Sequence, residues 1–376
     1  MGTPSYNWVS VDLAALRHNY EALQKWVGPA VRVMAVVKAN AYGHGLVEAA
    51  KAFAAAGAVV FGVAELEEAV ALREAGLHGE IVVLFGAPSA AADEVAQYDL
   101  SPVVFGVEPL AVLSQAAVKA QKKIRVHLKV DVGMGRLGVL PAEAPQVAAA
   151  ICALPGLSLA GLLSHFPQAD LAQGATQDQY QEFEKVRRAI AALAPEAALA
   201  HIANSAGVLR FPEAHATMVR PGISLYGYYP SAVSRQPEVG LRPAMGFHTQ
   251  AVQVKEVPAG YGVSYGHRFV TSRPSRLAVL PVGYDDGYLR SLTGKAQVLI
   301  RGQRAPVVGT ICMNACMADV TGISGVDVGE PVVLMGGSGE AAIDADEIAG
   351  WMGTISYEVL CLFGSRNRHV YGEAGA

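Results

Sequence analysis

The sequence predicts an α/β protein in which a (β/α)8 barrel of the TIM type is followed by a C-terminal all-β domain. Short apolar, β-branched runs alternate eight times with alanine-rich helical stretches in the first part of the chain. Such alternation is typical of a parallel sheet that closes into a barrel. After about residue 240 the alanine-rich stretches vanish, and Val, Gly and Pro punctuate short runs instead. With 376 residues, 52% of them hydrophobic, the chain is long enough for both domains.

The barrel strands are expected where the apolar runs lie, because parallel strands buried on both faces are almost continuously apolar. An open doubly wound sheet is the structural alternative. No G-x-G-x-x-G motif follows the first run, which disfavours the dinucleotide-binding form of that alternative. The barrel strands are therefore predicted at residues 32–38, 58–63, 80–85, 101–105, 124–130, 159–164, 199–204 and 218–220.

The second domain is expected to be built from short strands separated by Gly and Pro. The segment 231–243 contains two prolines and few apolar residues, which predicts a linker. We place the barrel at residues 11–235 and the β domain at residues 241–376. Strands of the β domain are predicted at Leu277–Val282, Ala296–Ile300, Pro306–Ile311 and Pro331–Met335.

Charge and composition favour small molecules as partners. A net charge of -4 with scattered Lys and Arg leaves no basic stripe for nucleic acid. The most apolar window, 147–163, is interrupted by Pro155 and Gly156, so no membrane span is expected. The four cysteines form no C-x-x-C pair, and the first ten residues lack the pattern of a signal peptide. These features predict a cytoplasmic protein, and no metal site is expected.

Polar residues end or follow five of the eight predicted strands, at the end of a barrel where active sites lie. Each of them alone has a structural interpretation, such as a satisfied polar group. Their occurrence on one face together predicts a single site. The residues are Lys38 after the first strand, Lys129, Asp131 and Arg136 at the fifth, His165 at the sixth, Asn204 and Ser205 at the seventh, and Arg220 at the eighth.

Lys38 follows the buried run Val33–Val37 and precedes a stretch that contains Gly43 and Gly45. The amine is thereby placed where a strand opens into a loop. Desolvation at such a position favours the neutral amine, which acts as a nucleophile or a base and can form an imine. The alternative is a lysine that extends its amine to solvent from a strand edge.

The loops after the last two predicted strands suit a phosphate group, which barrels often bind at this place. In Asn204-Ser205-Ala206-Gly207, Ser205 supplies a hydroxyl donor. In Arg220-Pro221-Gly222-Ile223, Gly222 allows a close approach of the backbone to a ligand.

The stretch from Val33 to Gly45, VMAVVKANAYGHG, resembles the pyridoxal phosphate lysine segment of bacterial alanine racemases. Further motifs match the same family in family order over nearly the whole chain: KVDVGMGRLG from Lys129, GYGVSYG from Gly260, GYDDGYLR from Gly283, GTICMN from Gly309 and ISYE from Ile355. The resemblance implies an isomerase that interconverts L-alanine and D-alanine with pyridoxal 5'-phosphate and supplies D-alanine for peptidoglycan. It also implies a homodimer with shared active sites, and pairing of residues 1–10 with the β domain.

The resemblance implies two catalytic bases. Lys38 holds the cofactor and serves one face of the substrate α-carbon, and Tyr265 of the partner subunit serves the other, with His165 between Tyr265 and Arg220. Arg220 faces the pyridine nitrogen of the cofactor. Because arginine stays protonated and can only donate, that nitrogen is expected to remain unprotonated. The implied phosphate ligands are Tyr42, Ser205, the amides of Gly222 and Ile223, and Tyr357, with Asn204 beside them.

The same resemblance assigns the substrate contacts. Arg136 is implied to bind the substrate carboxylate and the phenolic oxygen of the cofactor, for which bidentate arginine is suited. In relatives the lysine that corresponds to Lys129 is often carbamylated; the alternative here is a surface ion pair with Asp131. Met313 is implied to contact the substrate from the partner subunit, and Tyr284 and Arg290 are implied to line the entrance.

The chain departs from the family pattern at three places. Asn314 stands where the family usually has aspartate, Thr310 where it usually has arginine, and the segment Ser365–His369 lacks a proline usual there. These changes are expected to affect the entrance and the β domain. Alternative functions are a racemase of serine or of broad specificity, a decarboxylase of the same fold, and a non-catalytic pyridoxal phosphate-binding protein. Arg220 disfavours the decarboxylase, and Tyr265 would have no role in the non-catalytic protein.

Overall fold

The computed structural model describes residues 5–191, 193 and 199–372. The chain divides into two compact units. The barrel unit comprises Ala15–Ala41 and Leu46–Arg242, and the β unit comprises the chain up to Ala14, Tyr42–Gly45 and the chain from Pro243 onward. Within the described residues, none of the helices combines the length and the apolarity needed to cross a lipid bilayer.

The barrel unit contains a parallel sheet of eight strands among the described residues, in the order β8-β7-β6-β5-β4-β3-β2-β9. Backbone hydrogen bonds from Thr217 N to Ala200 O (3.2 Å) and from Arg220 N to Ala203 O (2.9 Å) join the β8 and β9 segments and nearly close the ring. This arrangement confirms the predicted barrel. The strands are β2 (Arg32–Val36), β3 (Val60–Val63), β4 (Glu80–Val83), β5 (Ser101–Val104), β6 (Ile124–Lys129), β7 (Leu157–Leu163), β8 (Leu199–His201) and β9 (Met218–Val219).

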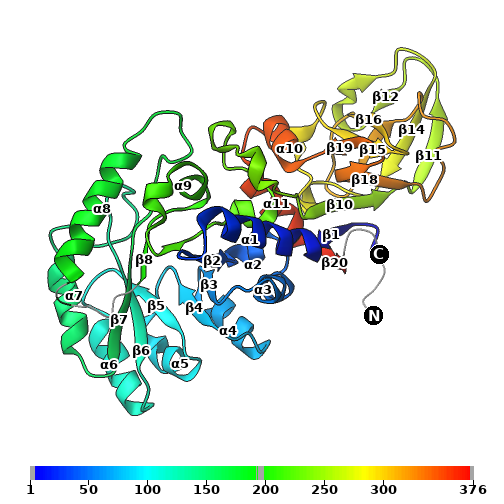
Figure 1. Cartoon of the computed structure of the whole chain (residues 1–376). Coiled ribbons are helices and arrows are strands. Elements are labelled where there is room, and N and C mark those ends of the chain that lie inside the picture. The colour runs from blue at the N-terminus through cyan, green and yellow to red at the C-terminus, as the bar shows by residue number, and fades with distance from the viewer. Residues whose placement is uncertain (1–4, 192, 194–198, 373–376) are drawn as a thin grey trace. The chain divides into compact units, whose positions relative to one another are not determined.

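Helices alternate with these strands and lie outside the ring (Figure 1). Each long helix buries one apolar stripe: in α1, for example, Leu16, Tyr20 and Leu23 are buried at helical spacing. The strands β3 and β5 are buried at every position, as expected for a barrel wall covered on both faces. The helices are α1 (Leu13–Val27), α3 (Leu46–Ala55), α4 (Leu66–Glu74), α5 (Ala92–Gln97), α6 (Leu110–Lys119), α7 (Ala144–Ala153), α8 (Thr176–Ala191) and α9 (Ser205–Arg210), whereas the segment α2 (Lys38–Tyr42) is a left-handed turn.

The β unit is built mainly from antiparallel strands in the order β11-β14-β17-β16-β15-β18-β10-β1-β20, with β19 beside β18 and a separate β12-β13 pair. It confirms the predicted β domain after the barrel. Its strands are β1 (Trp8–Asp12), β10 (Met245–Gln250), β11 (Gln253–Val257), β12 (Gly262–Val263), β13 (Phe269–Val270), β14 (Ser275–Leu280), β15 (Gln297–Ile300), β16 (Gln303–Val308), β17 (Cys316–Asp319), β18 (Pro331–Ser338), β19 (Ala341–Ile343) and β20 (Arg368–Gly372).

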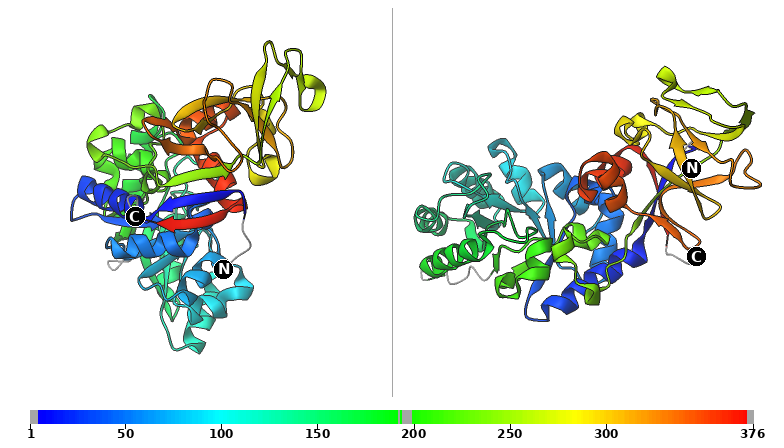
Figure 2. Two further views of the ribbon diagram at one scale, coloured as in Figure 1. Left: turned by 90° about the vertical axis from the view of Figure 1, so that its right-hand side faces the viewer. Right: turned by 90° about the horizontal axis from the view of Figure 1, so that it is seen from above.

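The first strand of the chain lies in this sheet. β1 pairs antiparallel with β10 and parallel with β20, so blue and red strands run side by side in Figure 2. Of the first ten residues, which we expect to pair with the β domain, residues 1–4 lie outside the described residues. The segment 231–243, expected to be a linker, contains the short 3-10 helices η4 (Ala232–Ser234) and η5 (Pro237–Val239).

The β unit also contains two helices that the change in composition did not predict. In α10 (Ala345–Met352), the Asp344 side chain accepts the amide of Glu347, and Gly353 ends the helix with φ 78°. These capping residues are the signal that sequence reasoning overlooked. The second helix, α11 (Ser356–Arg366), buries Val359, Leu360 and Phe363.

Helix α11 makes a close contact with the segment that follows Lys38. A Cβ at Gly364 would lie 1.8 Å from Gly43 O, and a Cβ at Gly43 would lie 2.3 Å from Leu360 O. The His369 Nε2 atom is 2.7 Å from Gly43 O. Only glycine fits at both positions, because backbone atoms and not flexible side chains occupy the space.

The variant Gly364→Ala is therefore expected to lower the free energy of unfolding by about 3 kcal/mol, at the upper end of overpacking effects. The matched control is Gly350→Ala in α10, where a Cβ meets nothing within 4 Å. That control is expected to raise stability by up to about 1 kcal/mol, because alanine favours a helix. Urea unfolding of the two full-length variants measures both effects, and equal stability of the two would contradict the expectation.

Candidate active site

Basic side chains gather where the barrel strands end. Lys129 is the last residue of β6, Arg220 directly follows β9, and Lys38 and His165 lie two residues beyond β2 and β7. Because the strands are parallel, these ends lie at one face of the barrel. The predicted site residues in the barrel unit are Lys38, Lys129, Arg136, His165, Asn204, Ser205, Arg220, Gly222 and Ile223; those in the β unit are Tyr42, Tyr265, Tyr284, Arg290, Met313 and Tyr357.

The backbone after Lys38 has a rare conformation. The residues from Ala39 to Tyr42 have φ between 52° and 54°, which makes a left-handed helical turn without glycine. Each such residue costs roughly 1–2 kcal/mol relative to a right-handed turn. Strain of this kind persists only where the surroundings hold it, and it is common at functional sites.

Two side chains hold this turn. The Glu68 carboxylate accepts the amide of Asn40 at 3.3 Å with one oxygen and the amide of Ala64 at 2.9 Å with the other. The Asn40 side chain accepts the amide of Leu46 at 2.8 Å, at the start of α3. The left-handed turn after Lys38 is therefore held by hydrogen bonds to other parts of the barrel unit, although these residues by themselves favour a right-handed conformation.

The basic groups of the barrel unit perturb one another. Burial, and then the charges of Arg220 and Arg136, lower the pKa of Lys129 to about 8, and Lys38 adds to the effect. Burial and the same cations hold the pKa of His165 well below its usual range. Burial and the charge of Arg136 lower the pKa of Arg220 to about 9. This convergence of cations creates a site that favours an anionic ligand.

Arg220 is buried and held by neutral acceptors. Its NH1 atom donates to His201 Nδ1 at 3.0 Å and to His201 O at 2.6 Å. Its NH2 atom donates to the Ser164 carbonyl and, at 3.3 Å, to His165 Nδ1. These partners are carbonyls and imidazoles, so the guanidinium keeps its charge available to a ligand.

The loop after β6 is organised by Asp131. Its carboxylate accepts the amides of Gly133 (2.9 Å), Met134 (2.7 Å) and Arg136 (3.2 Å). Burial raises the pKa of Asp131, but these hydrogen bonds lower it by more, so the pKa lies below its ordinary value. The exposed Arg136 guanidinium lies 5.9 Å from the centroid of the Phe85 ring. Asp131 thus shapes the loop that carries Arg136.

Hydroxyl and amide groups cluster after β8 and β9. Ser205 Oγ accepts the amides of Gly222 at 2.9 Å and Ser224 at 3.3 Å, next to the 3-10 helix η3 (Ile223–Tyr226). The Asn204 side chain caps α9 by accepting the amide of Gly207 at 3.0 Å. The Ser224 hydroxyl is buried and has no hydrogen-bond partner among the described residues. Such a group of donors fits a phosphate.

Two predicted phosphate ligands meet within the β unit. The rings of Tyr42 and Tyr357 lie 6.1 Å apart between centroids. Burial, and then the neighbouring Tyr357, raise the pKa of Tyr42 well above its ordinary value. The Tyr42 hydroxyl therefore stays protonated and can donate a hydrogen bond.

Tyr265 combines an exposed ring with an anchored backbone. Its side chain is 70% exposed. Its carbonyl accepts a hydrogen bond from Thr310 Oγ1 at 2.9 Å, and Ser264 Oγ donates to the Thr310 carbonyl at 2.6 Å. Ser264 has φ 61°. Thr310, one of the departures from the family pattern, thus helps to fix the loop that presents Tyr265.

The predicted entrance residues lie on loops that contact one another. The amide of Tyr284 donates to the Cys312 carbonyl at 3.2 Å, and the amide of Asp285 donates to the Met313 carbonyl at 3.0 Å. Asn314, another departure, donates from Nδ2 to Asp285 at 3.3 Å. These hydrogen bonds join the loop that carries Tyr284 to the loop that carries Met313. Arg290 is exposed at the start of the 3-10 helix η8 (Arg290–Leu292).

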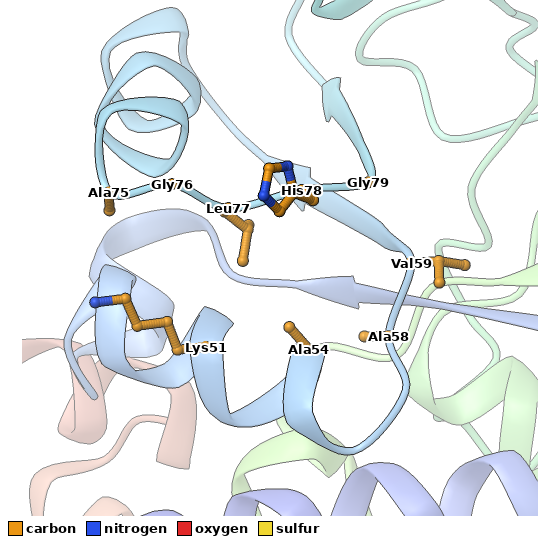
Figure 3. Close-up of a pocket in the computed structure, with 9 residues that line it drawn as sticks. All are labelled: Lys51, Ala54, Ala58, Val59, Ala75, Gly76, Leu77, His78 and Gly79. Carbon is orange, nitrogen blue, oxygen red and sulfur yellow. The ribbon is translucent and has the colours of Figure 1, made fainter.

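A surface hollow lies apart from the basic cluster within the barrel unit. It measures about 360 Å³ and is lined by α3 and the segment Ala75–Gly79, as Figure 3 shows. Its polar lining residues, Lys51 and His78, are exposed. The residues that line it, all of them described, include no buried polar side chain, so the hollow is a weaker candidate for catalysis.

Sequence reasoning missed several residues that support the cluster. Glu68 holds the turn after Lys38, and His201 accepts from Arg220. His127 and His201 interrupt apolar strands at buried positions. A histidine inside an otherwise apolar barrel strand is the signal that points to them.

Comparisons with known proteins agree over the whole chain. Residues 11–230 match the family model for the alanine racemase N-terminal domain, and residues 244–371 match that for the C-terminal domain. An alanine racemase of Syntrophobacter fumaroxidans is 42% identical over 97% of this chain and 96% of its own. One of Desulfovibrio desulfuricans is 43% identical over 97% and 98%.

Solved structures are similarly close. The alanine racemase of a D-cycloserine-producing Streptomyces lavendulae has a TM-score of 0.92 at 36% identity, covering 99% of this chain and 98% of its own. The alanine racemase of Bartonella henselae, with covalently bound pyridoxal phosphate, has a TM-score of 0.86 at 30% identity, covering 98% of this chain and 100% of its own.

Proposed function

The chain belongs to the alanine racemase family, and from that premise we propose that it is an isomerase that interconverts L-alanine and D-alanine with pyridoxal 5'-phosphate. What carries the proposal is the convergence of Lys38, Lys129, Arg136 and Arg220 at one end of the barrel, where each cation perturbs its neighbours. A phosphorylated cofactor and a substrate carboxylate supply the anions that this cluster needs.

The residues present fit the cofactor. Ser205 and the amides of Gly222 and Ile223 would bind the phosphate, with the hydroxyls of Tyr42 and Tyr357 as further donors. Asn204 supports them by capping α9. When bound, pyridoxal phosphate withdraws electrons from the α-carbon of the amino acid and so weakens its C–H bond.

Arg220 tunes that electron withdrawal. With a pKa of about 9, lowered by burial, its guanidinium is still protonated at neutral pH. It could only donate a hydrogen bond to a pyridine nitrogen held there, which would therefore stay unprotonated. Moderate electron withdrawal favours return of the proton over side reactions.

Racemisation requires one proton-transfer group on each face of the α-carbon. The Lys38 amine removes or returns the proton on one face. The Tyr265 hydroxyl of the partner subunit does so on the other, supported by His165, whose Nδ1 accepts from Arg220. Arg136 would bind the substrate carboxylate, and the Met313 backbone of the partner subunit would contact the substrate.

Exposure of the β unit supports a homodimer with shared active sites. Tyr265 is 70% exposed and Met313 is 55% exposed in the single chain, which leaves both side chains available to a second subunit. Tyr284 and Arg290 would line the entrance to each site. We also propose that the enzyme works in the cytoplasm and supplies D-alanine for peptidoglycan, since few cysteines suit a reducing compartment.

The first experiment incubates the purified protein with L-alanine and, separately, with L-serine, and follows optical rotation. Rapid loss of rotation with alanine alone supports alanine racemisation; equal rates with serine indicate a broader racemase. Release of CO2 without racemisation would indicate a decarboxylase, and bound cofactor without turnover a carrier. Borohydride reduction should abolish activity and fix the cofactor on Lys38, which peptide mass spectrometry detects.

Lys129 is expected to react with CO2 to form a carbamate, releasing one proton. At pH 7 an amine of pKa about 8 is about one-tenth neutral, whereas an ordinary lysine is neutral in about one molecule in three thousand. The nearby cations Arg136 and Arg220 then stabilise the carbamate anion. Nuclear magnetic resonance with [13C]bicarbonate should show a carbamate signal that grows as the pH rises from 6 to 8.

The control for this signal is Lys51→Ala, which removes an exposed lysine of α3. The signal should persist in that variant and disappear in Lys129→Ala. A signal that survives in Lys129→Ala would place the carbamate elsewhere, and no signal in the parent protein would leave Lys129 an ordinary amine.

A further inference from the structure

A line of hydrogen-bonded side chains runs through the barrel interior from Arg220. Arg220 NH1 lies 3.0 Å from His201 Nδ1, His201 Nε2 lies 3.0 Å from His127 Nδ1, and His127 Nε2 lies 3.2 Å from Glu80 Oε1. Both histidines are fully buried. We call Arg220, His201, His127 and Glu80 the histidine chain. It joins the strands β4, β6 and β8, which Figure 1 labels, to the residue that follows β9.

The two ends of this chain, the Arg220 guanidinium and the Glu80 carboxylate, together determine where its protons lie. Arginine has no acceptor, so His201 Nδ1 must accept from Arg220 and carries no proton. The proton of His201 is then on Nε2 and is donated to His127 Nδ1. By the same logic His127 carries its proton on Nε2 and donates it to Glu80. Both imidazoles then have the same tautomer, and every bond points away from Arg220.

A neutral His201 agrees with its surroundings. Burial, and then the charge of Arg220, hold the pKa of His201 well below its usual range. In a doubly protonated His201, the Nδ1–H group would also face an N–H group of Arg220, so that two donors would meet without an acceptor. His201 therefore links Arg220 to His127 by hydrogen bonds without adding a positive charge beside the basic cluster.

Glu80 ends the histidine chain at the opposite end of the barrel, as the first residue of β4. Its side chain is 8% exposed and also accepts from Ser101 Oγ at 2.9 Å and from Arg125 NH2 at 3.0 Å. Burial raises the pKa of Glu80, but the hydrogen bond from His127 and the charge of Arg125 help to bring it below its ordinary value. An ionised carboxylate can only accept, so the last bond has one allowed direction.

We propose that Glu80 is a positioning residue for Arg220, which it controls by fixing the tautomers of His127 and His201. Without an acceptor at the far end, His127 can carry its proton on Nδ1 instead. His201 must then accept at Nε2 and carry its own proton on Nδ1, where it faces a donor of Arg220. The guanidinium would lose an acceptor and shift. The consequence for catalysis rests on the proposed function, in which Arg220 donates to the pyridine nitrogen.

The test uses full-length holoenzyme labelled with [15N]histidine, in which 15N shifts report which imidazole nitrogen carries the proton. In the parent protein His127 and His201 should both show protonated Nε2 and unprotonated Nδ1. In Glu80→Leu, His201 should show protonated Nδ1 in a substantial fraction of molecules. Glu80→Asp, which keeps a carboxylate, should largely restore the parent pattern. Arg125→Gln is the control, because it removes a partner of the other carboxylate oxygen and leaves the chain in place.

Unchanged tautomers in Glu80→Leu would overturn the proposal. If that variant does not fold, His127→Phe interrupts the same chain and should change the tautomer of His201 alone; an unchanged His201 would overturn the proposal equally.

The catalytic consequence has its own readout. The kcat for alanine in Glu80→Leu should fall about 10- to 100-fold, as for a displaced catalytic group, with recovery in Glu80→Asp. Changed tautomers with unchanged kcat would overturn the positioning role. If the parent protein racemises no amino acid, the proposed function fails, while the tautomers still decide whether Glu80 orders the chain.

Discussion

Replacing Lys38 with alanine is expected to reduce alanine racemisation by at least about 10⁴-fold, because one change removes both the attachment point of the cofactor and a catalytic base. The side chain follows a strained turn that other residues hold in place, so no neighbouring amine can easily take over its position. Optical rotation measures the rate, and mass spectrometry after borohydride reduction measures covalently fixed cofactor. Both should be lost together.

The matched control for Lys38→Ala is Lys51→Ala. Lys51 is exposed, and its contact with Glu48 at 3.7 Å is a surface ion pair of little energetic weight. This control should racemise alanine at the parent rate. A Lys38→Ala protein that keeps more than about one-hundredth of the parent rate would show that another group serves that face.

Replacing Tyr265 with phenylalanine is expected to slow racemisation by about 10²- to 10⁴-fold while the absorbance of the bound cofactor persists. The equilibrium constant between enantiomers is one, so kcat/KM must fall equally in both directions. The asymmetry appears instead in solvent exchange: Lys38 should still exchange the α-hydrogen of one enantiomer for deuterium without inversion. Proton NMR in deuterium oxide measures this exchange for each enantiomer.

Tyr261→Phe is the control in the same segment, since its side chain is also exposed. It should leave the rate unchanged. Undiminished turnover of both enantiomers by Tyr265→Phe would remove Tyr265 from the mechanism.

Subunit mixing separates a partner's tyrosine from the chain's own. In a mixture of Lys38→Ala and Tyr265→Phe proteins, about half of randomly formed dimers are mixed, and each mixed dimer has one site without either change. Activity should recover to roughly a quarter of the parent value. Without recovery, Tyr265 serves its own subunit.

The barrel was predictable because its strands must be apolar on both faces. Runs such as Val33–Val37 stand out for that reason, and even the short strand β9, with Met218 and Val219, lies within the predicted run 218–220. The helices α10 and α11 were not, because the change in composition after residue 240 outweighed the local capping signal at Asp344. Short helices that pack on a sheet depend on tertiary contacts.

At the candidate site the structure shows a backbone conformation that the local sequence does not favour. Ala39 and Ala41 carry Cβ atoms and favour a right-handed turn, so their left-handed conformation depends on the distant Glu68. His127 and His201 are separated by one strand and two helices, and each alone suggests an ordinary buried histidine. The hydrogen bonds that link His201 through His127 to Glu80 form only when the barrel strands assemble.

The contact of Gly43 with Gly364 and His369 has a consequence for synthesis on the ribosome. Gly43 is translated about 320 residues before its packing partners Gly364 and His369. In the same way, β1 cannot complete its strand pairing until β20 has been made. Domains generally fold as they are made, starting from the N-terminus. Here the loop after Lys38 cannot be completed until α11 and β20 have been made, so a nascent chain that stops before them lacks the partners of Gly43.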